Sequence, residues 1–270
     1  RVYDVGVAGG PVEIGCVNRT RNDVYAVGVD GDLAFVGDQG LRVVDLDPSR
    51  EPAEIGAVEL EGTVTSVAVA PGPLVAVGTW EVDKPGSWRN RLLIVDRSDP
   101  RQPRARGGFD LPETSERGSC RLALDGNVVA VAAEDAGLLL VGVDDPDHPV
   151  ELAHAPTSLP AVDVVLTGGL AVVATGTEPS PQTGRLEIYD VSEPTAPALV
   201  GAIAFPDLPR AIAVSDGKVL VAFSSTVRTV DLGTPSAPLE LGVADIPLGR
   251  VTRAAIDGGY AYLSVTPGSL

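Results

Sequence analysis

Aspartate recurs at the end of a short apolar run all along the chain, and such carboxylates could bind calcium or accept hydrogen bonds from the turn that follows. The recurring residues are Asp4, Asp45, Asp96, Asp190 and Asp231. Carboxylates at fixed offsets are suitable ligands for calcium. An Asp that enters a proline-rich turn more often accepts the backbone N–H groups of its neighbours. We therefore expect a structural role and no cofactor, with calcium in these acidic turns as the alternative.

A second set of candidate residues consists of charged side chains at positions where the equivalent residues of other units are small. Aligning the first strand of each of six similar units places the following residues at one level: Ala26, Ser66, Arg121, Asp163, Ala211 and Arg253. Arg210 enters from the connection just before such a strand. Convergent guanidinium groups in an acidic protein could bind a carboxylate or phosphate group. Ser66, Arg121, Asp163, Arg210 and Arg253 are therefore candidate ligand-binding residues, although we favour an internal Arg121–Asp163 ion pair without a ligand.

Both tryptophans of the chain lie in one long connection between strands, at Thr79–Asn90. A second long connection spans Thr175–Gly184, whereas the equivalent connections of the other units have three or four residues. Long loops in an economical repeat tend to carry recognition, and Trp is a preferred anchor for protein or sugar surfaces. The candidate partner-binding residues are Trp80, Trp88, Glu81, Asp83, Arg89 and Glu178. The alternative is that a Trp folds back and caps its own sheet.

Enzymatic motifs are scarce. The sequence has no nucleophile elbow, zinc-binding, phosphate-binding or dinucleotide-binding pattern in a suitable setting. His148 and His154 fall in a turn and on an outer strand, where we expect them to be surface residues. A carboxylate-driven reaction needs no motif, and it stays open for these residues: Glu81, Asp83, Glu134, Asp135, Asp163 and Glu178. We expect no catalytic residue and no enzyme, with a small-anion or carboxylate-dependent enzyme site as the alternative.

Composition narrows the class of protein and of partner. The chain has 270 residues, 44% of them hydrophobic, with 31 Gly and 23 Pro, which is typical of a folded, turn-rich domain rather than a disordered one. Its net charge of −17 argues against nucleic acid and favours a soluble monomer. It has no apolar run long enough to insert in a membrane, and it starts without Met, so we expect a mature or excised domain.

One pattern repeats along the chain: a β-rich run that ends in Asp, a Pro-x-x-Pro turn and a further strand. The copies are Leu41–Gly56, Arg91–Gly107, Leu138–Ala153, Arg185–Gly201, Val227–Gly242 and, at the start, Arg1–Gly15. The third copy has Gly142 in place of Asp, with Asp144 two residues later. The copies recur every 41 to 51 residues, which is the length of a four-stranded propeller blade.

Each repeat contains four short β runs separated by turn residues, with no helical periodicity. We therefore predict an all-β, six-bladed β-propeller with four-stranded blades, as a single domain over residues 1–270. The last blade would combine residues 243–270 with residues 1–20, and this pairing of the two ends would remove an open sheet edge. In such a ring the row containing Arg121, Asp163 and Arg253 lies at the axial channel.

The two cysteines, Cys16 and Cys120, fall on opposite sides of this ring. A disulfide requires Cα atoms about 4 to 7 Å apart. We therefore expect two free thiols.

The motifs LRVVD, RLLIVD and RLEIYD, each followed by a Pro-x-x-Pro turn, resemble the LVIVD-repeat family of bacterial β-propellers. The resemblance covers nearly the whole chain. It implies a secreted or surface-associated bacterial protein, extracellular or possibly periplasmic, of unknown function. It also implies a non-enzymatic recognition or scaffold module, which we expect to bind a protein or a glycan through its loop face.

Overall fold

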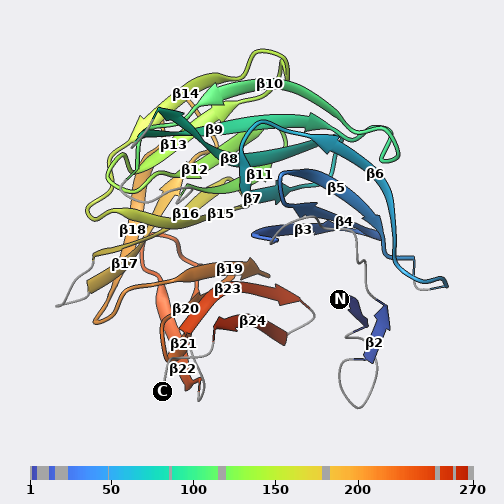
Figure 1. The fold of residues 1–270 in the computed structure, drawn as a ribbon. Helices are drawn as coiled ribbons and strands as arrows, with labels where there is room; N and C mark the ends of the chain where they lie inside the picture. The colour runs from blue at the N-terminus through green and yellow to red at the C-terminus, as the bar shows by residue number, and fades with distance from the viewer. Residues whose placement is uncertain are drawn as a thin grey trace. The chain divides into compact units, whose positions relative to one another are not determined.

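The computed structural model describes residues 2–4, 12–15, 24–47, 49–84, 87–114, 120–177, 183–246, 250–257 and 260–266. Over these residues the regular structure is entirely β (Figure 1). The chain divides into two compact units, and each is described by itself. The N-terminal unit comprises Arg1–Gly118 with Val143–Pro149, and the C-terminal unit comprises Ser119–Gly142 with Val150–Leu270.

The N-terminal unit contains a two-stranded sheet and two four-stranded antiparallel sheets. The small sheet pairs β1 (Val2–Asp4) with β2 (Val12–Gly15). The first large sheet has the order β3 (Ala26–Asp30), β4 (Leu33–Gly37), β5 (Gly40–Asp45), β6 (Ala53–Glu59). The second has the order β7 (Thr63–Val69), β8 (Leu74–Lys84), β9 (Ser87–Asp96), β10 (Arg104–Asp110).

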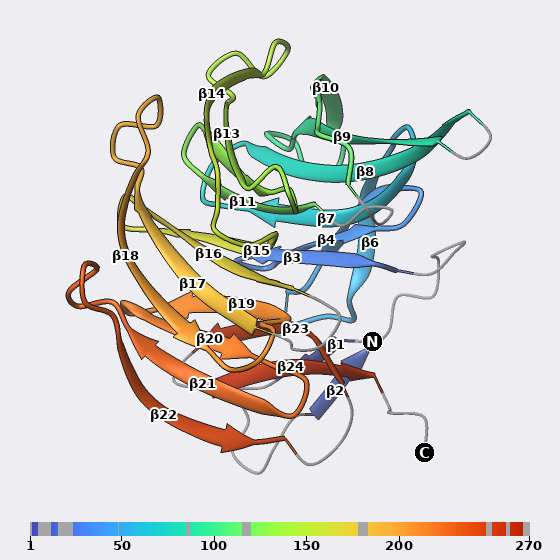
Figure 2. The same ribbon diagram turned by 90° about the vertical axis from the view of Figure 1, so that its left-hand side faces the viewer.

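The C-terminal unit contains three four-stranded sheets and a final hairpin (Figure 2). The first sheet has the order β11 (Arg121–Asp125), β12 (Val128–Ala132), β13 (Leu138–Gly142), β14 (Val150–Ala155). The second has β15 (Ala161–Thr167), β16 (Leu170–Thr177), β17 (Thr183–Asp190), β18 (Ala198–Phe205). The third has β19 (Ala211–Ser215), β20 (Lys218–Ala222), β21 (Thr226–Asp231), β22 (Leu239–Asp245), and the hairpin pairs β23 (Arg250–Asp257) with β24 (Tyr260–Thr266).

Strand β16 is buried on both faces because a sheet packs on each side: Ala171 and Val173 belong to one hydrophobic core, and Val172 and Ala174 belong to another. Every residue of β13 is buried, and the sequence there is the uninterrupted apolar run LLLVG. Apolar residues of adjacent sheets form joint cores, as where Leu138 and Leu140 of β13 meet Ala171 and Val173 of β16. Continuous Val, Leu, Ile and Ala runs are what sheets covered on both faces require.

The repeated Asp residues have the structural role predicted from the sequence. Asp45, Asp96, Asp190 and Asp231 each accept a hydrogen bond from the backbone N–H two residues later, at 2.9 to 3.0 Å. These bonds close the turn after the third strand. For Asp96 and Asp190, the hydroxyl of the serine two residues later, and next its backbone N–H, hold the pKa of the carboxylate below its usual value.

The outer strand of each large sheet carries a β-bulge at the equivalent position. The register shifts between Val43 and Val44, Ala105 and Gly108, Leu140 and Val141, Ile188 and Tyr189, and Thr229 and Val230. On β6, β10 and β18, a glycine next to the bulge lies against the proline-rich turn of the following repeat. A Cβ atom on Gly56 would approach Pro100 O to 2.3 Å, and one on Gly201 would approach Pro235 O to 2.0 Å. The glycine therefore lets successive repeats meet backbone to backbone.

The sequence predicts that the two ends of the chain complete one four-stranded sheet. Among the described residues, β1 pairs with β2 and β23 pairs with β24, as two separate sheets. That these two sheets join into one blade stays a prediction.

The structure describes one of the two cysteines. Cys120 is a free, buried thiol, and burial raises its pKa to about 12. Cys16 lies outside the described residues. In the part of the chain that the structure describes, no helix is long and apolar enough to cross a membrane.

Candidate functional site

The connection Thr79–Asn90 is a strand extension rather than the loop that its length suggested. Strand β7 pairs with β8 as far as Trp80, and β10 pairs with β9 as far as Arg91. Beyond these points β8 and β9 pair only with each other, and Figure 2 shows the hairpin projecting past its sheet. Alternating apolar and charged residues, as in Trp80, Glu81 and Val82, favour a strand over a loop.

The register of this hairpin places both tryptophans on one face. Trp80 lies opposite Asn90, and Val82 lies opposite Trp88. Residues that face each other across an antiparallel pair point to the same side, as do residues two apart along a strand. Glu81 and Arg89 form the next cross-strand pair, so they belong to the other face. Both indoles are half-buried rather than fully exposed, whereas Val82 is 61% exposed.

Asn90 anchors the base of the hairpin. It is 2% exposed, and its Nδ2 donates to Thr114 Oγ1 at 2.8 Å. The Leu111 N–H donates to the Asn90 carbonyl at 2.9 Å. These bonds hold β9 against the segment after β10, so the hairpin is fixed at its base.

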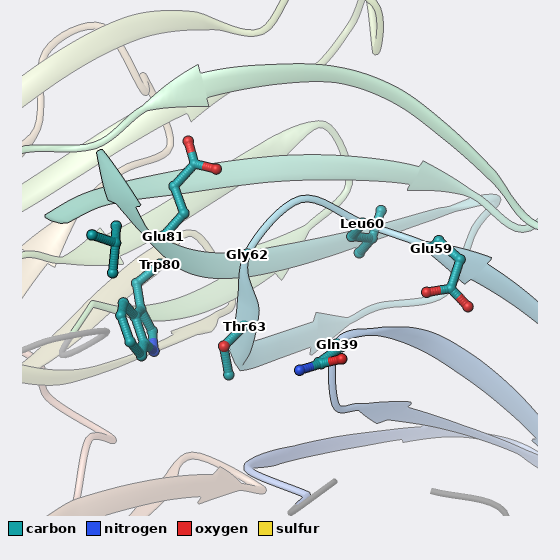
Figure 3. A pocket seen from close by; sticks show the side chains of 8 residues that line it. Gln39, Glu59, Leu60, Gly62, Thr63, Trp80 and Glu81 are labelled. Atoms are coloured by element: carbon teal, nitrogen blue, oxygen red, sulfur yellow. The ribbon is translucent and has the colours of Figure 1, made fainter. Parts of the chain in front are cut away.

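An open pocket of about 460 Å³ lies beside the hairpin (Figure 3). Three segments line it: the β4–β5 turn, the β6–β7 connection and strand β8. The lining residues are Gln39, Glu59, Leu60, Gly62, Thr63, Trp80, Glu81 and Val82. Figure 3 shows Trp80 and Glu81 on opposite sides of β8, so both flanks of the strand contribute.

Gly62 allows the β6–β7 connection to lie against β8. Its φ is +83°, a conformation that L side chains rarely adopt, and a Cβ there would approach Trp80 O to 2.5 Å. A larger residue would push the connection away from β8, and the pocket between them would change shape.

Sequence reasoning placed Trp80 and Glu81 at a recognition face but missed Gln39, Glu59, Leu60, Gly62 and Thr63. Gln39, Leu60 and Gly62 lie in the turn and the connection, and Glu59 and Thr63 end the strands on either side of that connection. No motif marks these residues. Gln39 and Glu59 come from the neighbouring sheet, whereas Thr63 is the register partner of Trp80 on β7. The predicted Asp83 and Glu178 side chains lie outside the described residues. Arg89 is exposed and belongs to the hairpin, but it does not line the pocket.

The second candidate set lies in the C-terminal unit. Its register confirms the sequence alignment, because each residue pairs with the same position of the next strand: Arg121 with Ala132, Asp163 with Ala174, Ala211 with Ala222 and Arg253 with Ser264. A bulge precedes Asp163 and another precedes Arg253. Bulges re-aim the side chain that follows. Ser66 occupies the equivalent position of its own sheet in the N-terminal unit, opposite Gly78, and is buried.

Asp163 bonds to the backbone of two neighbouring strands. Its Oδ1 accepts the N–H of Val164 at 3.0 Å, and its Oδ2 accepts the N–H of Ile212 at 2.9 Å. Burial raises the pKa of Asp163, against the lowering effect of Arg121 and of these N–H groups. The carboxylate thus ties β15 to β19.

Arg253 is half-buried, and its Nη1 donates to the carbonyl of Thr252 at 2.8 Å. Burial, and secondly the positive charge of Arg121, lower the pKa of the Arg253 guanidinium to about 10. Arg121, Asp163 and Arg253 therefore form one electrostatic cluster. Arg210 immediately precedes β19, and its N–H donates to Ala222 O at 2.7 Å.

The histidines are surface residues, as the sequence predicted. His148 and His154 are both exposed. His148 pairs with Asp145 at 2.9 Å, and this contact raises its pKa. Within the described ranges, no group of three His, Cys, Asp or Glu side chains is placed to hold a metal ion.

Comparisons with known proteins agree with this architecture. A family model described as the LVIVD repeat matches residues 23–59, 116–157 and 160–204. The comparison with curated proteins found no match.

Three solved structures resemble the chain at low identity. Saccharomyces cerevisiae Sqt1 is 9% identical with a TM-score of 0.57, over 93% of this chain and 82% of that one. The Cps50 (Swd1) beta-propeller domain of Myceliophteria thermophila is 10% identical with a TM-score of 0.60, over 86% and 76%. A putative oxidoreductase (glucose dehydrogenase) from Thermus thermophilus is 12% identical with a TM-score of 0.59, over 90% of each chain.

At such identities the likeness shows the fold alone, and the fold is a β-propeller. The chain carries LVIVD repeats, as its motifs predicted.

Proposed function

We propose that this protein is a non-enzymatic recognition module whose β8–β9 hairpin and adjoining pocket bind a macromolecular partner. The observation that carries the proposal is the pocket lined by Trp80 on a projecting hairpin. A β-propeller of the repeat family suggests a binding or scaffold module, and Trp is a preferred residue at the centre of interfaces. The hairpin is anchored at its base by Asn90, so its face is largely formed before a partner arrives.

The test compares single Trp80→Ala and Trp88→Ala variants of the full chain with wild type on defined peptide and glycan arrays. We expect either substitution to weaken binding by about 30-fold, the effect of losing an interface anchor. Thermal melting should show that both variants remain folded.

Tyr260→Ala is the matched control, because Tyr260 is an aromatic residue of β24 that is 70% exposed. Its binding should equal that of wild type. Unchanged binding in both Trp variants, or no binding by wild type on either array, would contradict the proposal.

The axial alternative, an anion or carboxylate-dependent site at Arg121, Asp163 and Arg253, is less well supported. Both oxygens of Asp163 already accept backbone hydrogen bonds. We propose that this cluster is structural.

The proposal includes a closed ring of six blades over residues 1–270 that acts as a monomer. The repeat spacing in the sequence supports the blade number. The resemblance of the motifs to bacterial surface-associated propellers supports an extracellular or cell-surface location.

A further inference from the structure

The pocket beside the hairpin is acidic. Glu59 and Glu81 line it together with the amide of Gln39, the hydroxyl of Thr63 and the indole of Trp80, and no Arg, Lys or His is among the described lining residues. Thus the formal charges on these walls are all negative. The whole chain adds to this field with its net charge of −17.

The two carboxylates also differ from their neighbours in the sequence. Glu54 pairs with Arg42 at 3.4 Å, and Glu61 pairs with Arg91 at 3.0 Å. Glu59 lies between them in the sequence, yet over the described residues neither Glu59 nor Glu81 has a cation within 4 Å. The N-terminal unit therefore neutralises the acids around the pocket and leaves those on its walls available.

Arg89 is the nearest candidate for an internal partner, because it lies opposite Glu81 in the hairpin register. It does not line the pocket. Glu59 has no basic residue directly opposite it, because its register partner on β5 is Gly40.

An apolar surface accompanies the carboxylates. Trp80, Leu60 and Val82 line the pocket, and Trp88 shares the hairpin face with Trp80 and Val82. An indole face attracts Lys and Arg side chains, with a preference for Arg. The long aliphatic stems of these side chains also cover apolar surface while their charged ends reach polar groups.

We infer that the pocket binds an arginine- or lysine-bearing segment of a partner protein, with the aliphatic stems against Trp80 and Leu60 and the cationic groups at Glu59 and Glu81. Charge complementarity distinguishes this occupant from a neutral glycan or an acidic peptide. The inference rests on the proposed function and specifies the chemistry of its partner.

The experiment uses the wild-type full chain, in which both Trp residues of the sequence lie on the hairpin. Their fluorescence is titrated with an eight-residue peptide that alternates Arg and Gly, and with the same peptide carrying neutral citrulline in place of Arg. We expect the Arg peptide to bind at least 10-fold more tightly than the citrulline peptide. Raising the salt concentration should weaken the binding of the Arg peptide selectively.

Glu59→Gln and Glu81→Gln test the two carboxylates. Each should weaken the Arg peptide about two- to five-fold, as expected for a solvent-accessible ion pair, without affecting the citrulline peptide. Glu151→Gln is the matched control, because it removes the same charge from an exposed position of β14 in the C-terminal unit. It should leave binding unchanged.

Three results would overturn the inference: equal binding of the Arg and citrulline peptides, equal effects of the pocket and control variants, or binding of a methyl glucoside without binding of the Arg peptide. Failure of this inference can be distinguished from failure of the proposed function. If only the inference is wrong, binding that depends on Trp80 persists with ligands that carry no positive charge.

Discussion

Asp163 shows how one side chain can resemble a functional residue and have a structural role. It is an acidic, half-buried residue that interacts electrostatically with the guanidinium groups of Arg121 and Arg253. Such a pattern is typical of binding sites. Its oxygens nevertheless accept the N–H groups of Val164 and Ile212, and the second bond joins two sheets. The carboxylate therefore satisfies backbone donors that would otherwise lack partners.

Changing Asp163 to Asn should destabilise the protein. One carboxylate oxygen becomes an NH₂ donor that faces a backbone N–H, and such a loss costs about 1–3 kcal/mol. In a domain of this size, each kcal/mol lowers the melting temperature by about 2–4 °C. Calorimetry of wild type and variant measures the difference.

Phosphate tests whether the cluster of Arg121, Asp163 and Arg253 binds an anion. If the cluster is structural, phosphate should change the melting temperatures of wild type and Arg253→Ala equally. A phosphate stabilisation that is present in wild type and lost in Arg253→Ala would show that the cluster binds an anion instead.

At the scale of elements, the outer strand of one repeat packs closely against the proline-rich turn of the following repeat. The bulge and its glycine recur, and in the C-terminal unit Gly201 of β18 lies against the turn at Pro235. The third repeat has Ala153 at the equivalent position, opposite Leu140.

Gly201→Ala should therefore be destabilising. The new Cβ would lie 2.0 Å from Pro235 O, so the turn must move. Overpacking of this kind costs about 1–3 kcal/mol. Leu199→Ala on the same strand is the control: Leu199 is 57% exposed, and we expect a change within about 0.5 kcal/mol. Denaturant unfolding compares the free energies of unfolding of the two variants. Equal values would show that β18 is not tightly packed against the turn at Pro235.

At the scale of the whole molecule, Gly242 is a repeat glycine without a described turn against it. Over the described residues, no atom lies within 4 Å of its added Cβ, although it follows the same bulge as Gly201. The sequence predicts the turn that would cover it at residues 8–11 of the N-terminal repeat, which lie outside the described residues. Closure of the six-bladed ring would bring that turn onto Gly242.

Ring closure predicts that deleting Arg1–Val17 lowers the melting temperature by at least about 6 °C. Burial of two apolar side chains is worth about 3 kcal/mol, and each kcal/mol corresponds to about 2–4 °C. Gly242→Ala sharpens the test. It should destabilise the full chain and have no effect in the truncated one, so a double-mutant cycle isolates the contact. A truncation that leaves the melting temperature unchanged would refute closure.

The sequence alone determined the strands, their repeat and the turns. These features depend on local chemistry: an apolar run forms a strand, and an Asp such as Asp45 bonds a backbone N–H two residues away. The same local logic erred where strand and loop compete, because the chain continued β8 and β9 through Trp80 and Trp88 instead of forming a loop. Tertiary structure alone decided the pocket, since Gln39 and Glu59 reach Trp80 only when one sheet packs on the next. It also decided the role of Asp163, whose bonding partner Ile212 lies 49 residues further along the chain.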